Sequence, residues 1–313
     1  MHREYEKGLL ALAIGILPSI TAKKPAQGRD KVAAAIERFY EDGGLETAST
    51  IARERFRLGS ERDIPASEIA KFEVGMAVAV LVNTSPVTFW FILLIHRHAG
   101  LRDDVRAEID ACIETTVEDG VTVKTIDILN LKANCPLLLS AYQETLRYAA
   151  IGTPVRQVTE DTYLDQWLLK KGAMVHMPTR AIHQDPNVYG PTATDYDPRR
   201  FLASEKKNRP KDHCFRAFGG GKHLCPGRHF ATNEVLATTA MFIARFDMEP
   251  ANGKWELPTI ANSGSAGQVM EPDYDVDVSL RTRAGFEDVK WSLRLKTTDK
   301  IFAIVTEDVD EAA

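Results

Sequence analysis

One cysteine stands in a glycine-rich segment, FRAFGGGKHLCPGRHF, at residues 215–230. The glycines at 219–221 and Gly227 let the backbone turn sharply and approach a bulky group closely. Pro226 suits the first turn of a helix, where its missing N–H would have no partner. Cys225 therefore lies at a helix N-terminus, whose partial positive charge favours a thiolate. Such a thiolate suits a metal ligand better than a nucleophile, although a buried structural cysteine would fit the same residues.

Charge and cysteine usage exclude several classes of protein. The 313 residues contain 39 Lys and Arg against 44 Asp and Glu, a net charge of −5, which argues against a nucleic-acid partner. Four scattered cysteines without a CxxC pair argue against a disulfide framework or a zinc ribbon and favour a reducing compartment. A zinc site from His213, Cys214, His223 and Cys225 is disfavoured because their spacing is irregular.

Hydrophobic periodicity predicts a mainly α-helical domain with small β-sheets over residues 1–313. Short strands are expected within 153–175 and again after Pro250, with a long polar meander over 181–210. The acidic tail after Val305 is expected to be solvated. The predicted helices cover residues 31–41, 64–99, 103–114, 137–149 and 228–246.

The longest predicted helix, about 64–99, admits two interpretations. Residues 74–95 carry no charge and are long enough to span a bilayer. However, its middle contains Asn83, Thr84 and Pro86, and polar groups at mid-membrane are costly unless they face protein. A helix through the core of a soluble domain is therefore the preferred interpretation. Residues 8–16 are apolar but too short for an anchor, and acidic residues precede them, so no targeting signal is recognised.

The cysteine segment resembles the haem-binding loop of the cytochrome P450 family. The matching residues are Phe218, Gly221, Cys225 and Gly227, and His223 stands where the family has a basic residue. The resemblance implies that these residues bind haem, iron protoporphyrin IX, with the Cys225 thiolate as the axial iron ligand. Electron donation from such a thiolate favours O–O cleavage.

Two further segments resemble the family in the same chain order. Glu144 and Arg147 match the family's helix K, which here covers about residues 137–149. Considered alone, a Glu and an Arg three residues apart form an ordinary surface ion pair. Residues 180–201 resemble the family's meander. Considered alone, this segment would be interpreted as a polar loop that contains an arginine without a structural role. The resemblance implies that Arg200 joins Glu144 and Arg147 in a buried triad that fixes the haem loop.

The long helix departs from the family pattern. Residues 80–84 lack its usual glycine and acid, yet residues 83–90 resemble the central helix of cholesterol 7α-hydroxylase and the clan that includes prostacyclin synthase. Pro86 is expected to open the helix locally. Thr84, with Asn83 beside it, would then hold water for proton delivery on the distal side of the haem. The alternative is a proline-kinked core helix.

The resemblance implies a cytochrome P450 fold whose N-terminal part is missing. Arg156 begins a strand where the family often places a haem-propionate partner. Family members are longer on the N-terminal side, and they are usually anchored in the endoplasmic reticulum membrane facing the cytosol. A truncated, non-catalytic chain that holds haem weakly is therefore one alternative.

The function implied is a haem-thiolate monooxygenase. It would insert one oxygen atom from O₂ into a small apolar substrate, such as a sterol, a terpenoid or another secondary metabolite. Electrons would come from NADPH–cytochrome P450 reductase, since the chain has no GxGxxG or flavin motif. A haem-thiolate isomerase or dehydratase that needs no O₂ is the other alternative, because the acid of the long helix is absent.

Overall fold

The computed structural model describes most of the 313-residue chain, in two compact units. The first is formed mainly by Met1–Asn83, and the second by Thr84–Ser263 and Gln268–Ala313. Each unit is described by itself below. The described residues are 5, 8–14, 17–202, 212–263, 267–295, 304–305 and 308.

The first unit is helical. Its α4 begins at Lys23, eight residues before the predicted start at Lys31, because Pro25 lies in the first turn, where its missing N–H does no harm. The hydroxyl of Ser49 accepts a hydrogen bond from the backbone N–H of Ala52 and so caps α5. Its elements are α2 (Leu9–Ile14), α3 (Pro18–Thr21), α4 (Lys23–Glu41), η1 (Gly44–Glu46), α5 (Thr50–Ser60) and the N-terminal part of α6 (Ala66–Arg97).

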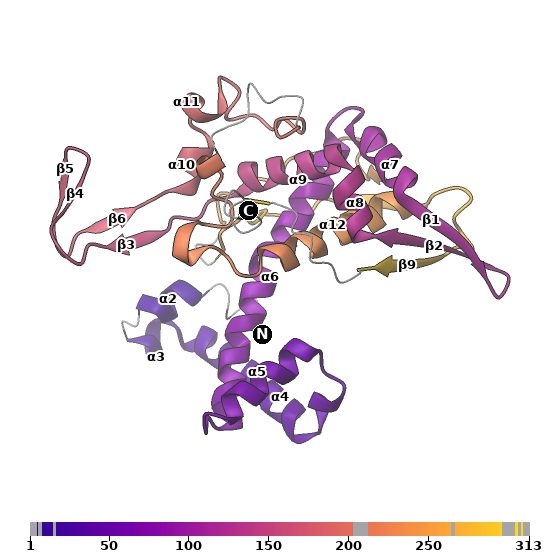
Figure 1. The fold of residues 1–313 in the computed structure, drawn as a ribbon. Coiled ribbons are helices and arrows are strands. Elements are labelled where there is room, and N and C mark those ends of the chain that lie inside the picture. Colours follow the sequence, from indigo (N-terminus) through magenta and orange to yellow (C-terminus); the bar gives the residue numbers. More distant parts are fainter. Residues whose placement is uncertain are drawn as a thin grey trace. The chain divides into compact units, whose positions relative to one another are not determined.

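The second unit contains the remaining helices, and the long predicted ones lie within a few residues of their expected places. Figure 1 shows α9 running beside the C-terminal part of α6, with α12 close by. Short helical turns lie in the meander and in the cysteine segment. These helices are α7 (Leu101–Cys112), α8 (Ile128–Asn134), α9 (Pro136–Ala149), α10 (Thr179–His183), α11 (Pro186–Tyr189), η3 (Asp212–Cys214), η4 (Gly221–His223) and α12 (Arg228–Arg245).

Four small sheets complete the second unit, and they confirm the predicted fold class. β1 and β2 form an antiparallel hairpin, and β9 joins β2 in parallel. β3 pairs with β6, β4 with β5 and β7 with β8, all antiparallel; the first two pairs form the long arm in Figure 1. The strands are β1 (Ile113–Glu118), β2 (Val121–Asp127), β3 (Val155–Gln157), β4 (Thr162–Leu164), β5 (Trp167–Leu169), β6 (Met174–His176), β7 (Phe246–Pro250), β8 (Val278–Thr282) and β9 (Lys290–Arg294).

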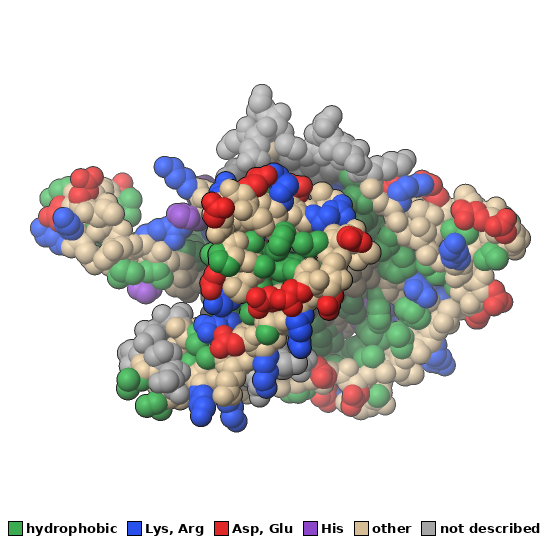
Figure 2. All heavy atoms as spheres, turned by 90° about the horizontal axis from the view of Figure 1, so that it is seen from below, with side chains coloured by type: hydrophobic (Ala, Val, Ile, Leu, Met, Phe, Trp, Pro, Cys, Tyr) green, Lys and Arg blue, Asp and Glu red, His purple; other side chains and the backbone are tan. Residues whose placement is uncertain are grey.

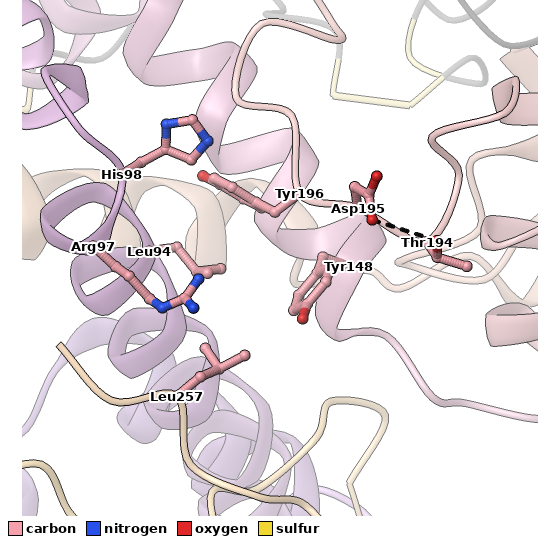
Figure 3. A pocket seen from close by; sticks show the side chains of 8 residues that line it. All are labelled: Leu94, Arg97, His98, Tyr148, Thr194, Asp195, Tyr196 and Leu257. Carbon is pink, nitrogen blue, oxygen red and sulfur yellow. Dashed lines mark hydrogen bonds between the residues drawn. The ribbon is translucent and has the colours of Figure 1, made fainter.

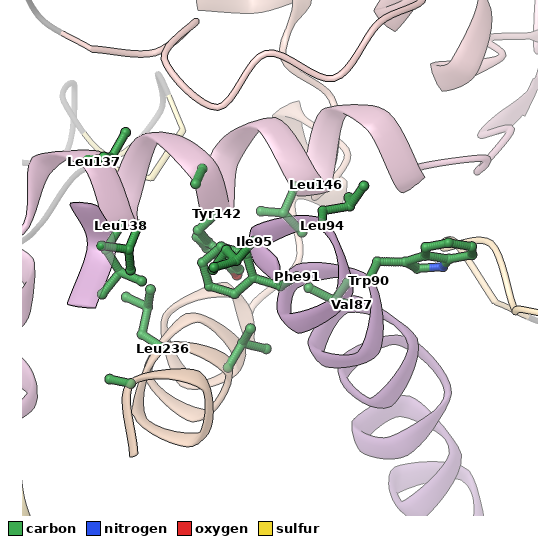
Figure 4. Close-up of a cluster of buried hydrophobic side chains, with 14 of the residues drawn as sticks. Val87, Trp90, Phe91, Leu94, Ile95, Leu137, Leu138, Tyr142, Leu146 and Leu236 are labelled. Atoms are coloured by element: carbon green, nitrogen blue, oxygen red, sulfur yellow. The ribbon is translucent and has the colours of Figure 1, made fainter. Parts of the chain in front are cut away.

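The core of the second unit lies where α6, α9 and α12 meet (Figure 4). Phe91 of α6 and Tyr142 of α9 are both buried, with ring centroids 5.7 Å apart. Leu236 of α12 is completely buried in the same cluster. The indole N–H of Trp90 donates to the Met270 carbonyl oxygen at 2.8 Å, so the one polar atom of this buried ring has a partner. These contacts fix α9 against α6 and α12.

Helix α6 runs without a break through Pro86. The local opening expected at this proline is therefore wrong, because the missing N–H removes one hydrogen bond and the rest of the helix continues. By length and hydropathy α6 is also apolar enough to cross a bilayer, and 44% of its most apolar window is buried. Trp90, Phe91 and Ile95 belong to the core, so the C-terminal part of α6 serves as a core helix.

Acidic and basic side chains are mixed on the face drawn in Figure 2, and neither sign forms a continuous area there. This mixture fits the small net charge of −5.

Candidate haem-binding site

The cysteine segment forms a tight, self-bonded loop before α12. Gly219 and Gly221 have φ angles of +80° and +59°, a region in which a side chain would be strained. The backbone N–H of Cys225 donates to the Phe218 carbonyl oxygen at 3.0 Å, and that of Leu224 donates to the Gly221 carbonyl oxygen at 3.0 Å. These bonds fix the position of the thiol relative to the start of α12.

The Cys225 thiol is half-buried and free, immediately before the helix N-terminus at Gly227. Within the described part of the chain, its sulfur has no hydrogen-bond partner. An accessible, unpartnered thiol in this setting fits the role of an axial ligand to haem iron. The zinc alternative gains no support, because the described residues hold no group of three or more His, Cys, Asp or Glu side chains arranged for a metal.

The structure brings Glu144, Arg147 and Arg200 together inside the protein. The Arg147 guanidinium forms a fork on the Glu144 carboxylate, with Nε–Oε2 and Nη2–Oε1 distances of 2.8 and 2.7 Å. Arg200 Nε lies 3.2 and 3.1 Å from the same two oxygens. The exposed fractions are 0% for Glu144, 1% for Arg147 and 5% for Arg200, so water does not screen these charges.

The two guanidinium groups also bind the backbone of the meander. Arg147 donates to the carbonyl oxygens of His183 and Ala193 at 2.6 Å and of Asp195 at 2.7 Å. Arg200 adds bonds to the carbonyl oxygens of Tyr189 and Thr192, each at 2.9 Å. Buried charges are stable only when their hydrogen-bonding capacity is satisfied, as it is here. The network therefore fixes the path of the chain from α10 to Phe201.

His183, which the sequence analysis did not select, links this network to the cysteine segment. Its Nδ1 lies 3.0 Å from the Arg147 carbonyl oxygen, and its Nε2 accepts a hydrogen bond from the backbone N–H of Arg216 at 2.9 Å. Gly219 N–H then donates to the Arg216 carbonyl oxygen at 3.0 Å. Burial, with Arg147 nearby, lowers the pKa of His183 from 6.5 to about 4, so the ring is neutral. A histidine within the predicted meander, in AIHQDP, was the available signal.

The acidic tail is not wholly solvated, and the prediction is wrong at Asp308. This residue is completely buried and pairs with Arg228, the first residue of α12, at 2.6 Å. Burial alone would raise the pKa of the Asp308 carboxyl. The backbone N–H groups of Ile304 and Val305, together with Arg228, outweigh that effect and hold the pKa below its usual value. Residues 306–307 and 309–313 lie outside the described residues.

The other predicted site residues lie on separate elements. Asn83 closes the first unit and Thr84 opens the second, in the middle of α6. Thr84 is 9% exposed, and its carbonyl oxygen accepts a bond from the Thr88 hydroxyl at 2.8 Å. Arg156 on β3 and His223 in η4 are exposed. Their predicted roles toward haem propionates, and those of Thr84 and Asn83 in proton delivery, stay predictions.

Comparison with known proteins identifies the family. The Cytochrome P450 family model matches residues 54–274. The cytochrome P450 monooxygenase nodJ of Hypoxylon pulicicidum is 34% identical over 311 residues, which cover 96% of this chain and 60% of the relative. The 5-beta-cholestane-3-alpha,7-alpha-diol 12-alpha-hydroxylase of Sus scrofa is 30% identical over 266 residues, 80% of this chain and 52% of the relative. This sterol hydroxylase agrees with the resemblance of residues 83–90.

Among solved structures, the haem domain of cytochrome P450DA matches with a TM-score of 0.58 and 17% identity. The match covers 72% of this chain and 47% of that chain, and at this identity it shows the fold alone. The chain spans 60% of the length of the Hypoxylon relative and 52% of that of the Sus scrofa relative. The family model covers more than half of the chain and includes the cysteine segment, so this chain belongs to the cytochrome P450 family.

Proposed function

We propose that the protein is a haem-thiolate monooxygenase. It inserts one oxygen atom from O₂ into an apolar small molecule, with electrons from an NADPH-dependent reductase. The single observation that carries the proposal is the free, half-buried Cys225 thiol at the N-terminus of α12. Two relatives, one named as a monooxygenase and the other as a sterol hydroxylase, support the reaction class and favour a sterol or another polycyclic substrate.

Each predicted site residue would have one role in haem binding, proton delivery or structural support. Cys225 would hold the haem iron, and the bound haem supplies oxygen chemistry that no amino-acid side chain provides. Phe218, Gly221 and Gly227 would shape the surface against the porphyrin, while Arg156 and His223 would pair with its propionates. Thr84 and Asn83 would hold a proton-donating water. Glu144, Arg147 and Arg200 would be structural, since their hydrogen bonds go to one another and to the meander backbone.

The reduced carbon monoxide spectrum of the haemin-loaded protein tests the axial ligand. A thiolate ligand gives a far-red-shifted Soret band, so Cys225→Ala should abolish this band. Cys214→Ala is the matched control, because Cys214 is also a half-buried free thiol but lies outside the loop. The proposal fails if Cys225→Ala keeps the band or if Cys214→Ala loses it.

Turnover assays with a panel of sterols and terpenoids then test the reaction class. Product should form only when O₂, NADPH and the reductase are all supplied, and it should contain one oxygen atom from labelled O₂. Substrate conversion without O₂ and reductase would instead assign the isomerase or dehydratase class.

A further inference from the structure

A cavity of about 270 Å³ opens beside the C-terminal end of α6, in the second unit (Figure 3). Its lining comes from α6, α9, the meander and Leu257, and it includes no residue of the cysteine segment. This volume is just below the usual range for small-molecule sites, about 300–1,000 Å³, and therefore suits a ligand with a single ring. Nothing in the proposed monooxygenase reaction uses this cavity.

The walls of the cavity are aromatic and aliphatic. Tyr148 and Tyr196 contribute two rings whose centroids lie 6.0 Å apart with planes at 82°. Leu94 and Leu257 add apolar surface on the α6 side, as Figure 3 shows. A planar aromatic ring can pack against one tyrosine face while its edge meets the other, the arrangement that aromatic quadrupoles prefer.

Arg97 supplies an available cation at this cavity. Its side chain is exposed, and it makes no hydrogen bond or ion pair with any residue that the structure describes. The next two arginines of the chain are engaged, since Arg102 pairs with Asp103 and Arg106 with Asp247. A basic residue in the last turn also complements the helix dipole, but that role leaves the guanidinium free. A free guanidinium fork matches a carboxylate in geometry and charge.

The opposite wall is rigid, and its Asp195 is the single acidic side chain among the described residues that line the cavity. The Asp195 backbone carbonyl is held by Arg147 at 2.7 Å, and the Tyr196 hydroxyl donates to the Ala141 carbonyl oxygen at 3.2 Å. Figure 3 shows Asp195 and Arg97 on opposite sides of the cavity, so an anionic group at Arg97 lies away from the Asp195 carboxylate. A preformed wall reduces the ordering that binding would require.

We propose that this cavity binds a small aromatic carboxylate. The ligand ring packs against Tyr148 and Tyr196, and its carboxylate forms hydrogen bonds with the Arg97 guanidinium. The apolar and aromatic walls accept the ring, and the Arg97 guanidinium accepts the negative charge.

Calorimetric titration of the full chain with benzoate and with neutral benzamide tests this proposal. Benzoate should bind about tenfold more tightly than benzamide, because only the anion pairs with Arg97. Arg97→Gln should remove this preference, whereas Arg102→Gln, a paired arginine outside the lining, should keep it. Tyr148→Leu should weaken both ligands.

Three results would overturn the proposal. The first is the absence of benzoate binding at millimolar concentration. The second is an Arg97→Gln protein that still prefers benzoate, or an Arg102→Gln protein that loses the preference. The third is unchanged benzoate affinity in Tyr148→Leu. Arg97 is exposed, so its substitution should leave the fold intact, and matching thermal unfolding curves would verify that.

Discussion

His183 shows how a single buried ring can make stability depend on pH. Its Nε2 accepts from Arg216 N–H, and its Nδ1 bonds to the Arg147 carbonyl oxygen, so both nitrogens are used only by the neutral ring. Protonation would turn the acceptor Nε2 into a donor facing another donor. Burial, reinforced by Arg147, lowers the pKa from 6.5 to about 4 in the folded protein.

We therefore predict an acid-sensitive contribution to stability. Between about pH 6.5 and pH 4 the unfolded chain binds a proton at His183 and the folded chain does not, so the free energy of unfolding falls as pH falls. The contribution of neutral His183 to the free energy of unfolding is complete above about pH 6.5. Roughly 2–3 kcal/mol of it is lost between pH 7 and pH 4.5. Urea unfolding across this range should show a shallower pH dependence for His183→Asn than for wild type. Exposed His223→Asn, as control, should follow wild type.

At the scale of elements, α9 is capped by a residue from another helix. The Glu108 carboxylate of α7 accepts bonds from the backbone N–H groups of Leu137 and Leu138, at distances between 3.0 and 3.1 Å. Cys135, at the N-cap position itself, makes no side-chain cap bond. The sequence predicts the helix from its periodicity, but local capping rules cannot find an acceptor 29 residues away.

Glu108→Ala should lower the free energy of unfolding by about 1–2 kcal/mol, because two N–H groups lose their acceptor and the helix dipole loses a favourable charge. Glu108→Gln should recover part of the loss. Asp104→Ala, which removes an exposed ion pair with Arg199 and one of two acidic charges in the first turn of α7, should change stability by less than about 1 kcal/mol. Equal losses from Glu108→Ala and Asp104→Ala in chemical denaturation would contradict the capping role.

The β1–β2 hairpin is an element that the sequence analysis missed. Its turn contains Asp119 and Gly120, both with positive φ, at 51° and 79°. An Asp-Gly pair between alternating segments is a strong hairpin signal, and the signal was present in TTVEDGVTVK. The predicted helix over 103–114 ends at Cys112 because the chain turns into this hairpin. Its third strand, β9, comes from the far end of the chain, which local patterns cannot reveal.

For the whole molecule, motif residues were easier to predict than the contacts that support them. Glu144 and Arg147 lie one helical turn apart, so their fork follows from local geometry, whereas Arg200 was placed only through the family resemblance. The carbonyl groups that surround both guanidinium groups come from residues 183–195, and His183 reaches the cysteine segment from there. Such long-range hydrogen bonds depend on how the elements pack, which local sequence patterns do not show. For the same reason, the acidic composition of the tail predicted solvation and did not reveal that Asp308 is buried.

Asp308 connects the far end of the described chain to the start of α12. Arg228 pairs with Asp308, and its Nη1 also lies 3.4 Å from the Cys225 carbonyl oxygen, so the tail supports the cysteine segment. Asp308→Ala removes the buried carboxylate that pairs with Arg228 and accepts from the Ile304 and Val305 N–H groups, and breaking such a buried pair costs up to about 3–5 kcal/mol. Exposed Asp288→Ala is the control and should leave stability unchanged. Haem content should fall together with stability in Asp308→Ala.

The pH dependence of the stability loss in Asp308→Ala distinguishes loss of the ion pair with Arg228 from loss of packing. The pKa of Asp308 lies below its usual value of 3.8, so its contribution is complete above that value and disappears as pH falls through the lower folded pKa. The stability difference between wild type and Asp308→Ala should therefore shrink below about pH 4. A difference that stays constant down to about pH 2.5 would assign the effect to packing against Ile304 and Val305.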